Sequence, residues 1–247
     1  MPIHIDNTAN VALSGIKGLV YGPPGVGKTT LCATADYVLI ISAEKGLLSI
    51  KDKAVDFVEV KSIADIGEVY SYLTTSEDYS TVCLDSISDI AEVVLSELKP
   101  LFKDTRQAYG EMADQMLQLV RAFRDLENYN VIFTAKSRRI VDPVGVSSFV
   151  PSTPGQVLPE AIPYMFDLVM PMHIGKDAEG KQFRYLQTQP DLHWIAKDRS
   201  GVLDKMEYPD LNHLFNKIIE ANPMEEVAGD YETTDDVDPY EGQEQEP

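Results

Sequence analysis

Gly22-Pro23-Pro24-Gly25-Val26-Gly27-Lys28-Thr29 is the stretch of sequence that decides the fold. It matches the pattern G-x-x-x-x-G-K-[S/T], in which backbone N–H groups surround phosphate oxygens. Because Gly makes up roughly 7% of residues in average proteins, a chance match in one chain of this length is about a one-in-a-hundred event. An apolar strand-like run, 17–21, precedes the stretch, and a helix-forming run, 28–36, follows it. This context predicts a phosphate-binding loop between a buried strand and a helix.

Each position of the loop has a chemical reason. Gly25 and Gly27 let the main chain approach phosphate oxygens without a Cβ in the way. Lys28 has the length and charge to reach the β- and γ-phosphates, and the Thr29 hydroxyl can ligate Mg²⁺. ATP and Mg²⁺ are therefore the predicted cofactors. The predicted nucleotide contacts are Gly22, Pro23, Pro24, Gly25, Val26, Gly27, Lys28, Thr29 and Thr30.

Two acids complete the predicted site. Asp85 ends the apolar run Thr81-Val-Cys-Leu and is the expected second metal-binding residue beside Thr29. Hydrolysis also needs a group that orients and deprotonates water. Ring-forming AAA+ machines commonly carry a Glu directly after the strand acid, but this chain has Ser86 there. Glu44, just past the apolar run 37–42, is the alternative base, on the expectation that its strand neighbours the loop strand and ends at the same edge of the sheet.

Apolar runs alternate with amphipathic ones along most of the chain. We expect strands at 17–21, 37–42, 57–60, 81–85, 130–135, 167–172, 183–188 and 192–196, and helices at 28–36, 64–74, 86–99, 109–127 and 210–220. The Gly-, Pro- and Ser-rich stretch 137–158 is expected to be a long functional loop. This rhythm predicts an α/β fold with a mostly parallel, twisted sheet flanked by helices.

Four segments in this order resemble the core motifs of RecA-type recombinase ATPases. They are the glycine-rich loop, Ile-Ile-Ser-Ala-Glu44-Lys-Gly-Leu, Val-Cys-Leu-Asp85-Ser86 and Val-Ile-Phe-Thr-Ala-Lys136. The chain is most similar to the short, phage-encoded RecA-like proteins of single-strand annealing, over residues 15–220. The resemblance implies a RecA-like core and a bacterial host cytoplasm as the location.

The resemblance also implies roles for individual residues. Glu44 would activate water, and Lys136 would stand where recombinases carry a γ-phosphate sensor that is usually Gln. Lys197 and Arg199 would reach a neighbouring subunit's ATP, so that turnover requires a homo-oligomer, either a ring or a filament. Residues 100–110 and 137–158 would be two DNA-binding loops. Their cations are Lys103, Arg106, Arg138 and Arg139, and their aromatic residues are Tyr109 and Phe149.

Single-stranded DNA is the predicted partner, because cationic loops with aromatic residues suit a phosphate backbone and its bases. The alternative for the cluster Lys136-Ser-Arg-Arg139 is an ordinary solvated segment. Two other functions stay open. One is an ATPase switch or loader that acts on a replication protein, such as a helicase or a single-strand-binding protein. The other is a small-molecule P-loop kinase, although no Arg-rich lid is evident.

Charge and composition divide the chain into a leader (1–14), one ATPase domain (15–223) and a tail (224–247). The net charge is -19, and the tail carries ten acids with no Lys or Arg, so we expect it to be disordered. The tail either solubilises the protein or competes with a phosphate backbone for a basic surface. No apolar run has the length of a membrane span or a signal peptide, which favours a cytoplasmic protein. The two cysteines are expected to be structural thiols, and the four histidines have no metal-ligand spacing.

Overall fold

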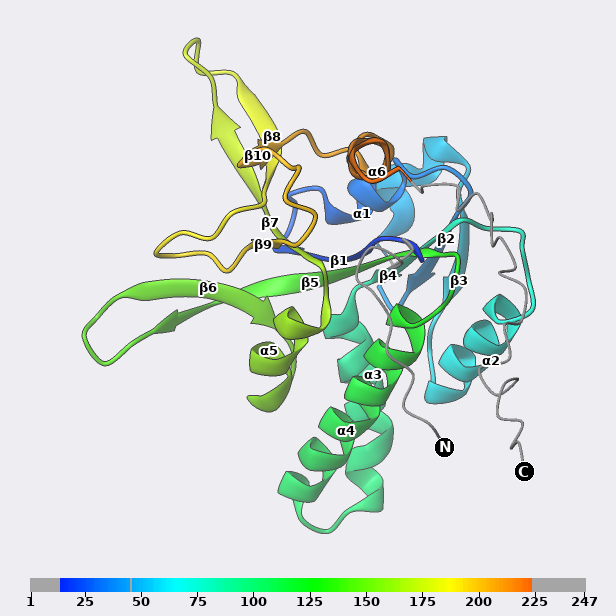
Figure 1. Cartoon of the computed structure of the whole chain (residues 1–247). Coiled ribbons are helices and arrows are strands. Elements are labelled where there is room, and N and C mark those ends of the chain that lie inside the picture. Colours follow the sequence, from blue (N-terminus) through cyan, green and yellow to red (C-terminus); the bar gives the residue numbers. More distant parts are fainter. Residues whose placement is uncertain (1–13, 45, 224–247) are drawn as a thin grey trace, which may run out of the picture.

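The computed structural model describes residues 14–44 and 46–223, in which a ten-stranded sheet has helices on both faces (Figure 1). The predicted leader, except Ser14, and the predicted acidic tail lie outside the described residues. The strands are β1 (Lys17–Gly22), β2 (Val38–Ser42), β3 (Asp56–Glu59), β4 (Thr81–Asp85), β5 (Asn130–Val141), β6 (Ser147–Ser152), β7 (Leu168–Lys176), β8 (Gln182–Gln187), β9 (Lys197–Asp198) and β10 (Met206–Glu207).

The helices follow the strands along the chain. They are α1 (Lys28–Cys32), η2 (Leu47–Lys53), α2 (Ile63–Leu73), α3 (Ile87–Leu98), η3 (Lys99–Leu101), α4 (Thr105–Arg124), α5 (Val157–Ala161), η4 (Ile162–Met165) and α6 (Leu211–Ala221). No helix in the described part of the chain is long and apolar enough to cross a membrane.

The main path of the sheet runs β10-β8-β7-β1-β5-β4-β2-β3, with β6 paired to β5 and β9 to β7. The six strands from β7 to β3 are parallel to their neighbours on this path, whereas β6, β8, β9 and β10 add antiparallel pairs. The predicted α/β fold with a mostly parallel sheet is confirmed. One expectation about it is wrong, because β4 and β5 separate the Glu44 strand, β2, from the loop strand, β1.

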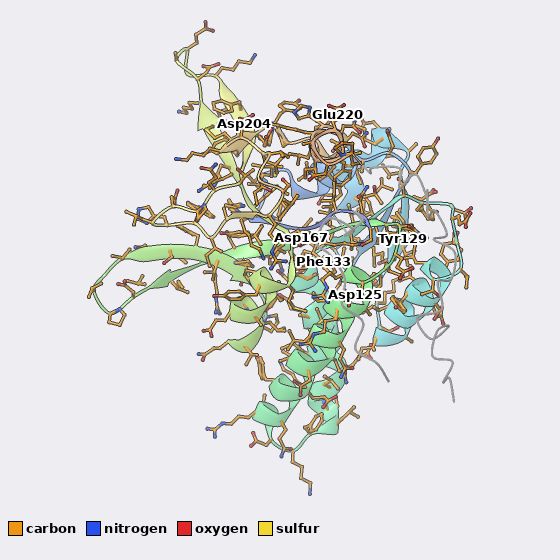
Figure 2. All side chains as sticks on the ribbon, in the orientation of Figure 1. Asp125, Tyr129, Phe133, Asp167, Asp204 and Glu220 are labelled. Carbon is orange, nitrogen blue, oxygen red and sulfur yellow. The ribbon has the colours of Figure 1, made fainter. Side chains whose placement is uncertain are left out.

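Alternating side chains of the central strands build two cores. Leu19, Val82 and Phe133 belong to the core under α2–α5, whereas Val20, Cys83 and Ile132 belong to the core under α1 and α6. Successive strand residues point to opposite faces, so a strand that is covered on both faces must be apolar throughout. Both cysteine thiols are buried. Figure 2 shows Asp125, Tyr129 and Phe133 on the path from the end of α4 into β5.

The prediction of a long loop over residues 137–158 is wrong. β5 continues to Val141 and pairs with β6 in an antiparallel hairpin, and α5 follows. The turn between the strands contains Pro143 and Gly145, and the Asp142 side chain accepts hydrogen bonds there from the backbone N–H groups of Val144 and Val146. The apolar β-branched residues on either side continue the strands.

Two further segments differ in secondary structure from the expectation. The predicted loop 100–110 is largely helical, because the Asp104 side chain accepts a hydrogen bond from the Arg106 N–H and starts α4 at Thr105. The predicted strand 192–196 is not a strand. Instead, the Asp191 side chain accepts hydrogen bonds from the His193 and Trp194 N–H groups, which turns the chain, and only Trp194 forms an isolated bridge, to Phe149.

Candidate nucleotide-hydrolysis site

The glycine-rich loop leaves β1 at Gly22 and enters α1 at Lys28. Gly25 and Gly27 have φ values of 76° and 112°, which L-residues with a side chain rarely adopt. At Gly22 a Cβ atom would lie 2.9 Å from the Met172 carbonyl oxygen on β7. Backbone conformation at two positions and close packing at a third therefore explain the three glycines of the motif.

Thr29 and Asp85 meet as the sequence predicts. The Thr29 hydroxyl donates a hydrogen bond of 2.6 Å to one oxygen of the Asp85 carboxylate. The buried Thr134 hydroxyl on β5 donates to the other oxygen at 2.5 Å. Mg²⁺ prefers oxygen ligands and keeps several waters, so a hydroxyl and a fixed carboxylate at the mouth of a phosphate-binding loop suit this ion. The residues present therefore fit Mg²⁺.

Lys28 closes the loop on itself. Its ammonium group donates hydrogen bonds to the carbonyl oxygens of Gly22 (3.0 Å) and Pro23 (3.1 Å). Burial lowers the pKa of Lys28, while the nearby carboxylates of Asp85 and Glu44 act in the opposite direction. The cation thus lies beside the metal-binding acid and the candidate base, on the side of the loop where phosphates would bind.

Glu44 follows β2 at the carboxyl edge of the sheet. The Ser42 hydroxyl donates to the Glu44 carbonyl oxygen at 2.9 Å and accepts from the Glu44 N–H at 3.2 Å, which fixes the turn after the strand. Ser42 pairs with Asp85 in the register of β2 and β4, so both acids emerge at the same edge although β2 is not next to β1. A hydrogen bond with Asp89, burial and the charge of Asp89 raise the pKa of Glu44 to about 7.

Asp89 connects Glu44 to Lys136. Its carboxylate accepts a hydrogen bond of 2.5 Å from the Lys136 ammonium group and another from the Ser86 hydroxyl. Lys136 also contacts Glu92 at 3.3 Å, and its backbone N–H donates to Ser88 at 2.9 Å. The structure therefore brings Lys136 beside the hydrolysis site, held by acids of α3.

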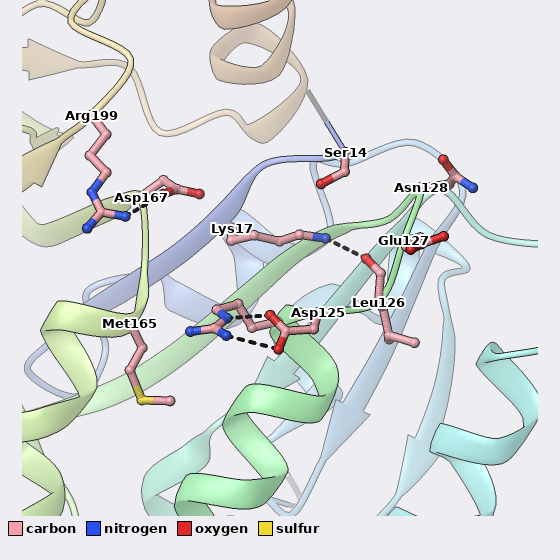
Figure 3. A pocket seen from close by; sticks show the side chains of 10 residues that line it. Ser14, Lys17, Asp125, Leu126, Glu127, Asn128, Met165, Asp167 and Arg199 are labelled. Carbon is pink, nitrogen blue, oxygen red and sulfur yellow. Dashed lines mark hydrogen bonds and ion pairs between the residues drawn. The ribbon is translucent and has the colours of Figure 1, made fainter. Parts of the chain in front are cut away.

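Lys197 and Arg199 lie away from this site within one chain. β9 pairs with the first residues of β7, and the Arg199 guanidinium forms an ion pair of 3.0 Å with Asp167 (Figure 3). The same pocket is lined by Lys17, the first residue of β1, whose ammonium group donates to the Leu126 carbonyl oxygen. Lys197 and Arg199 are thus near the end of β1 opposite the glycine-rich loop, and neither contacts its own chain's phosphate site.

The four predicted DNA-binding cations do not form one cluster. Lys103 and Arg106 are exposed near the start of α4, whereas Arg138 and Arg139 are on the β5–β6 hairpin. Because neighbouring strand residues point to opposite faces, the two arginines separate. Arg138 donates to the Gly155 carbonyl oxygen at 3.3 Å, and Arg139 donates to the Ser147 hydroxyl.

Three residues of the site escaped the sequence analysis. Asp89 is the fourth residue of Ser86-Ile-Ser-Asp89, a pattern that indicates only a helix N-cap, and Ser86 does cap α3. Thr134 is hidden inside an apolar strand. Arg184 on β8 donates a hydrogen bond of 2.8 Å to the Val26 carbonyl oxygen of the loop, and its position depends on a β7–β8 pairing that no local motif reveals.

A loop that surrounds phosphates, a metal-binding pair and an acid poised to accept a proton define the class of P-loop ATPases. The comparison with protein families gives the more specific assignment. A family model described as an AAA domain matches residues 14–200, and the chain belongs to this family.

No curated protein matches the chain. Among solved structures, the chain is similar to a KaiC-like protein from the hyperthermophilic archaeon Pyrococcus horikoshii, with 13% identity and a TM-score of 0.39. The alignment covers 70% of this chain and 78% of the archaeal one. A likeness this weak carries no argument about function.

The carboxyl pair predicts a characteristic pH dependence of ATP turnover. A base must be ionised, so turnover should rise with pH through the Glu44 pKa of about 7. Asp89→Asn removes the carboxylate whose hydrogen bond and charge help to raise this pKa, so its rate profile should move to lower pH. The measurement is kcat between pH 5.5 and 8.5. Glu97→Gln, which removes an acid near the far end of α3, is the control and should keep the wild-type profile. Identical profiles for Asp89→Asn and the wild type would show that Asp89 does not set the pKa of Glu44.

Proposed function

We propose that this ATPase acts on single-stranded DNA in recombination or single-strand annealing, and that its ATP cycle is coupled to DNA through the β5–β6 hairpin. The observation that carries the proposal is the position of Lys136. This residue contacts Asp89, the partner of the candidate base, and belongs to the same strand as Arg138 and Arg139. Loss of the γ-phosphate would therefore act, through Asp89 and Lys136, on the start of the β5–β6 hairpin that carries Arg138 and Arg139.

The hydrolysis step follows from the residues of the site. Backbone N–H groups of the loop and the Lys28 ammonium group bind the β- and γ-phosphates. Glu44 accepts a proton from water as the water oxygen bonds to the γ-phosphorus and the bond to the β–γ bridging oxygen breaks. Mg²⁺, held by Thr29 and Asp85, would neutralise developing negative charge on the phosphate oxygens.

Lys197 and Arg199 complete the site from a neighbouring subunit in this proposal. Cations near the transferring phosphate stabilise charge in the transition state. The distance of both residues from their own phosphate site supports a role in trans, because they have no phosphate to contact within one chain. The active form would then be a homo-oligomer.

Oligonucleotide titration tests the proposal against the loader alternative. A fluorescent single strand is titrated with the intact protein and with a version that ends at Asn222, at low and moderate salt, and ATPase is assayed with and without DNA. We expect salt-sensitive binding, tighter binding without the tail, and DNA-stimulated turnover. Arg138→Ala with Arg139→Ala should weaken binding and lower the logarithmic salt slope by about 0.7 for each of the two side chains that contacts a phosphate.

The matched control is Lys51→Ala with Lys53→Ala, which removes two exposed cations from η2. This double variant should bind like the wild type, which would separate a local contact from an effect of net charge. Absence of binding in every condition would refute the DNA proposal and favour a loader that binds a replication protein.

A further inference from the structure

Five aromatic rings form a continuous row between the two hairpins of the sheet. In spatial order they are Phe149, Trp194, His173, Tyr185 and Phe183, and we call them the aromatic row. Successive ring centroids are 4.3, 4.5, 4.9 and 5.8 Å apart. Figure 1 shows the β5–β6 and β7–β8 hairpins projecting on the same side of the sheet, with the segment that contains Trp194 between them.

The register of β7 and β8 sets the direction of these rings. His173 pairs with Tyr185 and Gly175 with Phe183, so both aromatic residues of β8 share a face with His173. A Cβ atom at Gly175 would lie 2.8 Å from the Phe183 ring, which shows that the ring lies across the glycine. The other face carries Arg184, which contacts the glycine-rich loop. The row and the nucleotide site therefore use opposite faces of one hairpin.

The rings of the row are accessible to solvent, unlike the aromatic residues of the core. Phe183 is 40% exposed and the other four rings are partly exposed, whereas Phe123, Phe133 and Phe166 have 1% exposure or less. If these rings formed a small hydrophobic core of their own, they would be buried as fully as the rings of the main cores. Burial lowers the pKa of His173, against the opposite effects of its hydrogen bond with Gln187 and the charge of Asp191, so this ring is neutral at physiological pH and stacks as an aromatic group.

The charge of the two hairpins suits a polyanion. Residues 136–152 and 173–195 contain six Lys or Arg and four Asp or Glu, in a chain whose net charge is -19. Three of the four acids, Asp142, Asp177 and Asp191, accept hydrogen bonds from backbone N–H groups in turns. Arg139 pairs with Phe149 in the hairpin register and so faces the same side as that end of the row.

The aromatic row is also joined to the nucleotide loop. The Tyr21 hydroxyl donates hydrogen bonds to the carbonyl oxygens of Ile195 (2.7 Å) and Phe149 (3.1 Å), and the Tyr21 ring lies 5.9 Å from Trp194. Tyr21 directly precedes Gly22, the first residue of the loop. Because Tyr21 is buried, a ligand on the row would act on the strand that presents the phosphate-binding loop through Trp194 and Ile195.

From these observations we infer that the aromatic row is the surface on which the bases of single-stranded DNA stack, with Arg139 contacting the phosphate backbone. The inference rests on the proposed function and names the surface that would contact the bases. Aromatic rings with adjacent cations bind single strands with little sequence preference, because every base has a π-face. Exposed Phe183 and half-buried Tyr185 would receive bases at one end of the row, and Phe149 with Trp194 at the other.

Intrinsic fluorescence tests the platform directly, because Trp194 is the single tryptophan of the chain. The full-length protein is titrated with an oligo(dT) single strand at low salt, and tryptophan emission and oligonucleotide anisotropy are recorded together. We expect quenching of Trp194 that follows the anisotropy curve. Phe183→Leu and Tyr185→Leu should each weaken binding about tenfold, within the range for one stacked base.

Phe57→Leu is the matched control, because Phe57 is 55% exposed on β3, the strand at the far edge of the sheet. Its affinity should equal that of the wild type, and thermal unfolding checks that all three variants are folded. Two results together would overturn the platform but not the proposed function. The wild type would bind the oligonucleotide without any change in Trp194 emission, and both β8 variants would bind it with wild-type affinity. A wild-type protein that binds no oligonucleotide would overturn the proposed function as well.

Discussion

Glu44→Gln is expected to stop ATP turnover while nucleotide binding persists. Gln keeps the size of the side chain but cannot accept a proton from water, and general-base catalysis is typically worth about 10² to 10⁴ in rate. The raised pKa of Glu44, about 7, is well matched to proton transfer near neutral pH. Single-turnover hydrolysis and nucleotide affinity should be measured on the same preparation, because the prediction separates the two.

The control for this substitution is Glu59→Gln, at the end of the adjacent strand β3. The Glu59 side chain forms an ion pair with Lys61. Its turnover should match that of the wild type. Normal turnover in Glu44→Gln would instead remove Glu44 from the mechanism and leave the deprotonation of water to another group.

Lys28→Ala is expected to cause the largest loss of nucleotide affinity. Hydrogen bonds to charged groups contribute about 1.5–3 kcal/mol, which corresponds to roughly 10- to 150-fold in affinity. The Lys28 ammonium group already lies against the loop carbonyls of Gly22 and Pro23, so little reorganisation separates it from a bound phosphate. Lys28→Arg is the informative comparison, since it keeps the charge but changes the shape of the donor group.

The nucleotide loop could be predicted from the sequence because its constraints are local. Glycine at Gly25 and Gly27 reflects backbone conformation, and Lys28 and Thr29 follow within two residues. Asp85 could be predicted for a related reason, since an acid that ends an apolar strand emerges at the carboxyl edge of a parallel sheet. Glu44 could be placed at that edge in the same way, although its strand lies three positions from β1.

The parts that could not be predicted depend on contacts between distant segments. Asp89 has the sequence context of a helix cap, and only the packing of α3 against β5 brings it to Lys136. The hairpin turn at Asp142 was hidden by a composition that suits loops. The aromatic row joins residues of β6, β7, β8 and the segment before β9, so no spacing along the chain reveals it.

The central claim is that the loop around Lys28 holds a nucleoside triphosphate, with Mg²⁺ shared between Thr29 and Asp85. Equilibrium titration of a non-hydrolysable ATP analogue, with and without Mg²⁺, tests it on the wild type, Lys28→Ala and Asp85→Asn. The account predicts Mg²⁺-enhanced binding in the wild type, a weakened enhancement in Asp85→Asn, and a loss of affinity in Lys28→Ala in both conditions. Wild-type affinity in Lys28→Ala would contradict it.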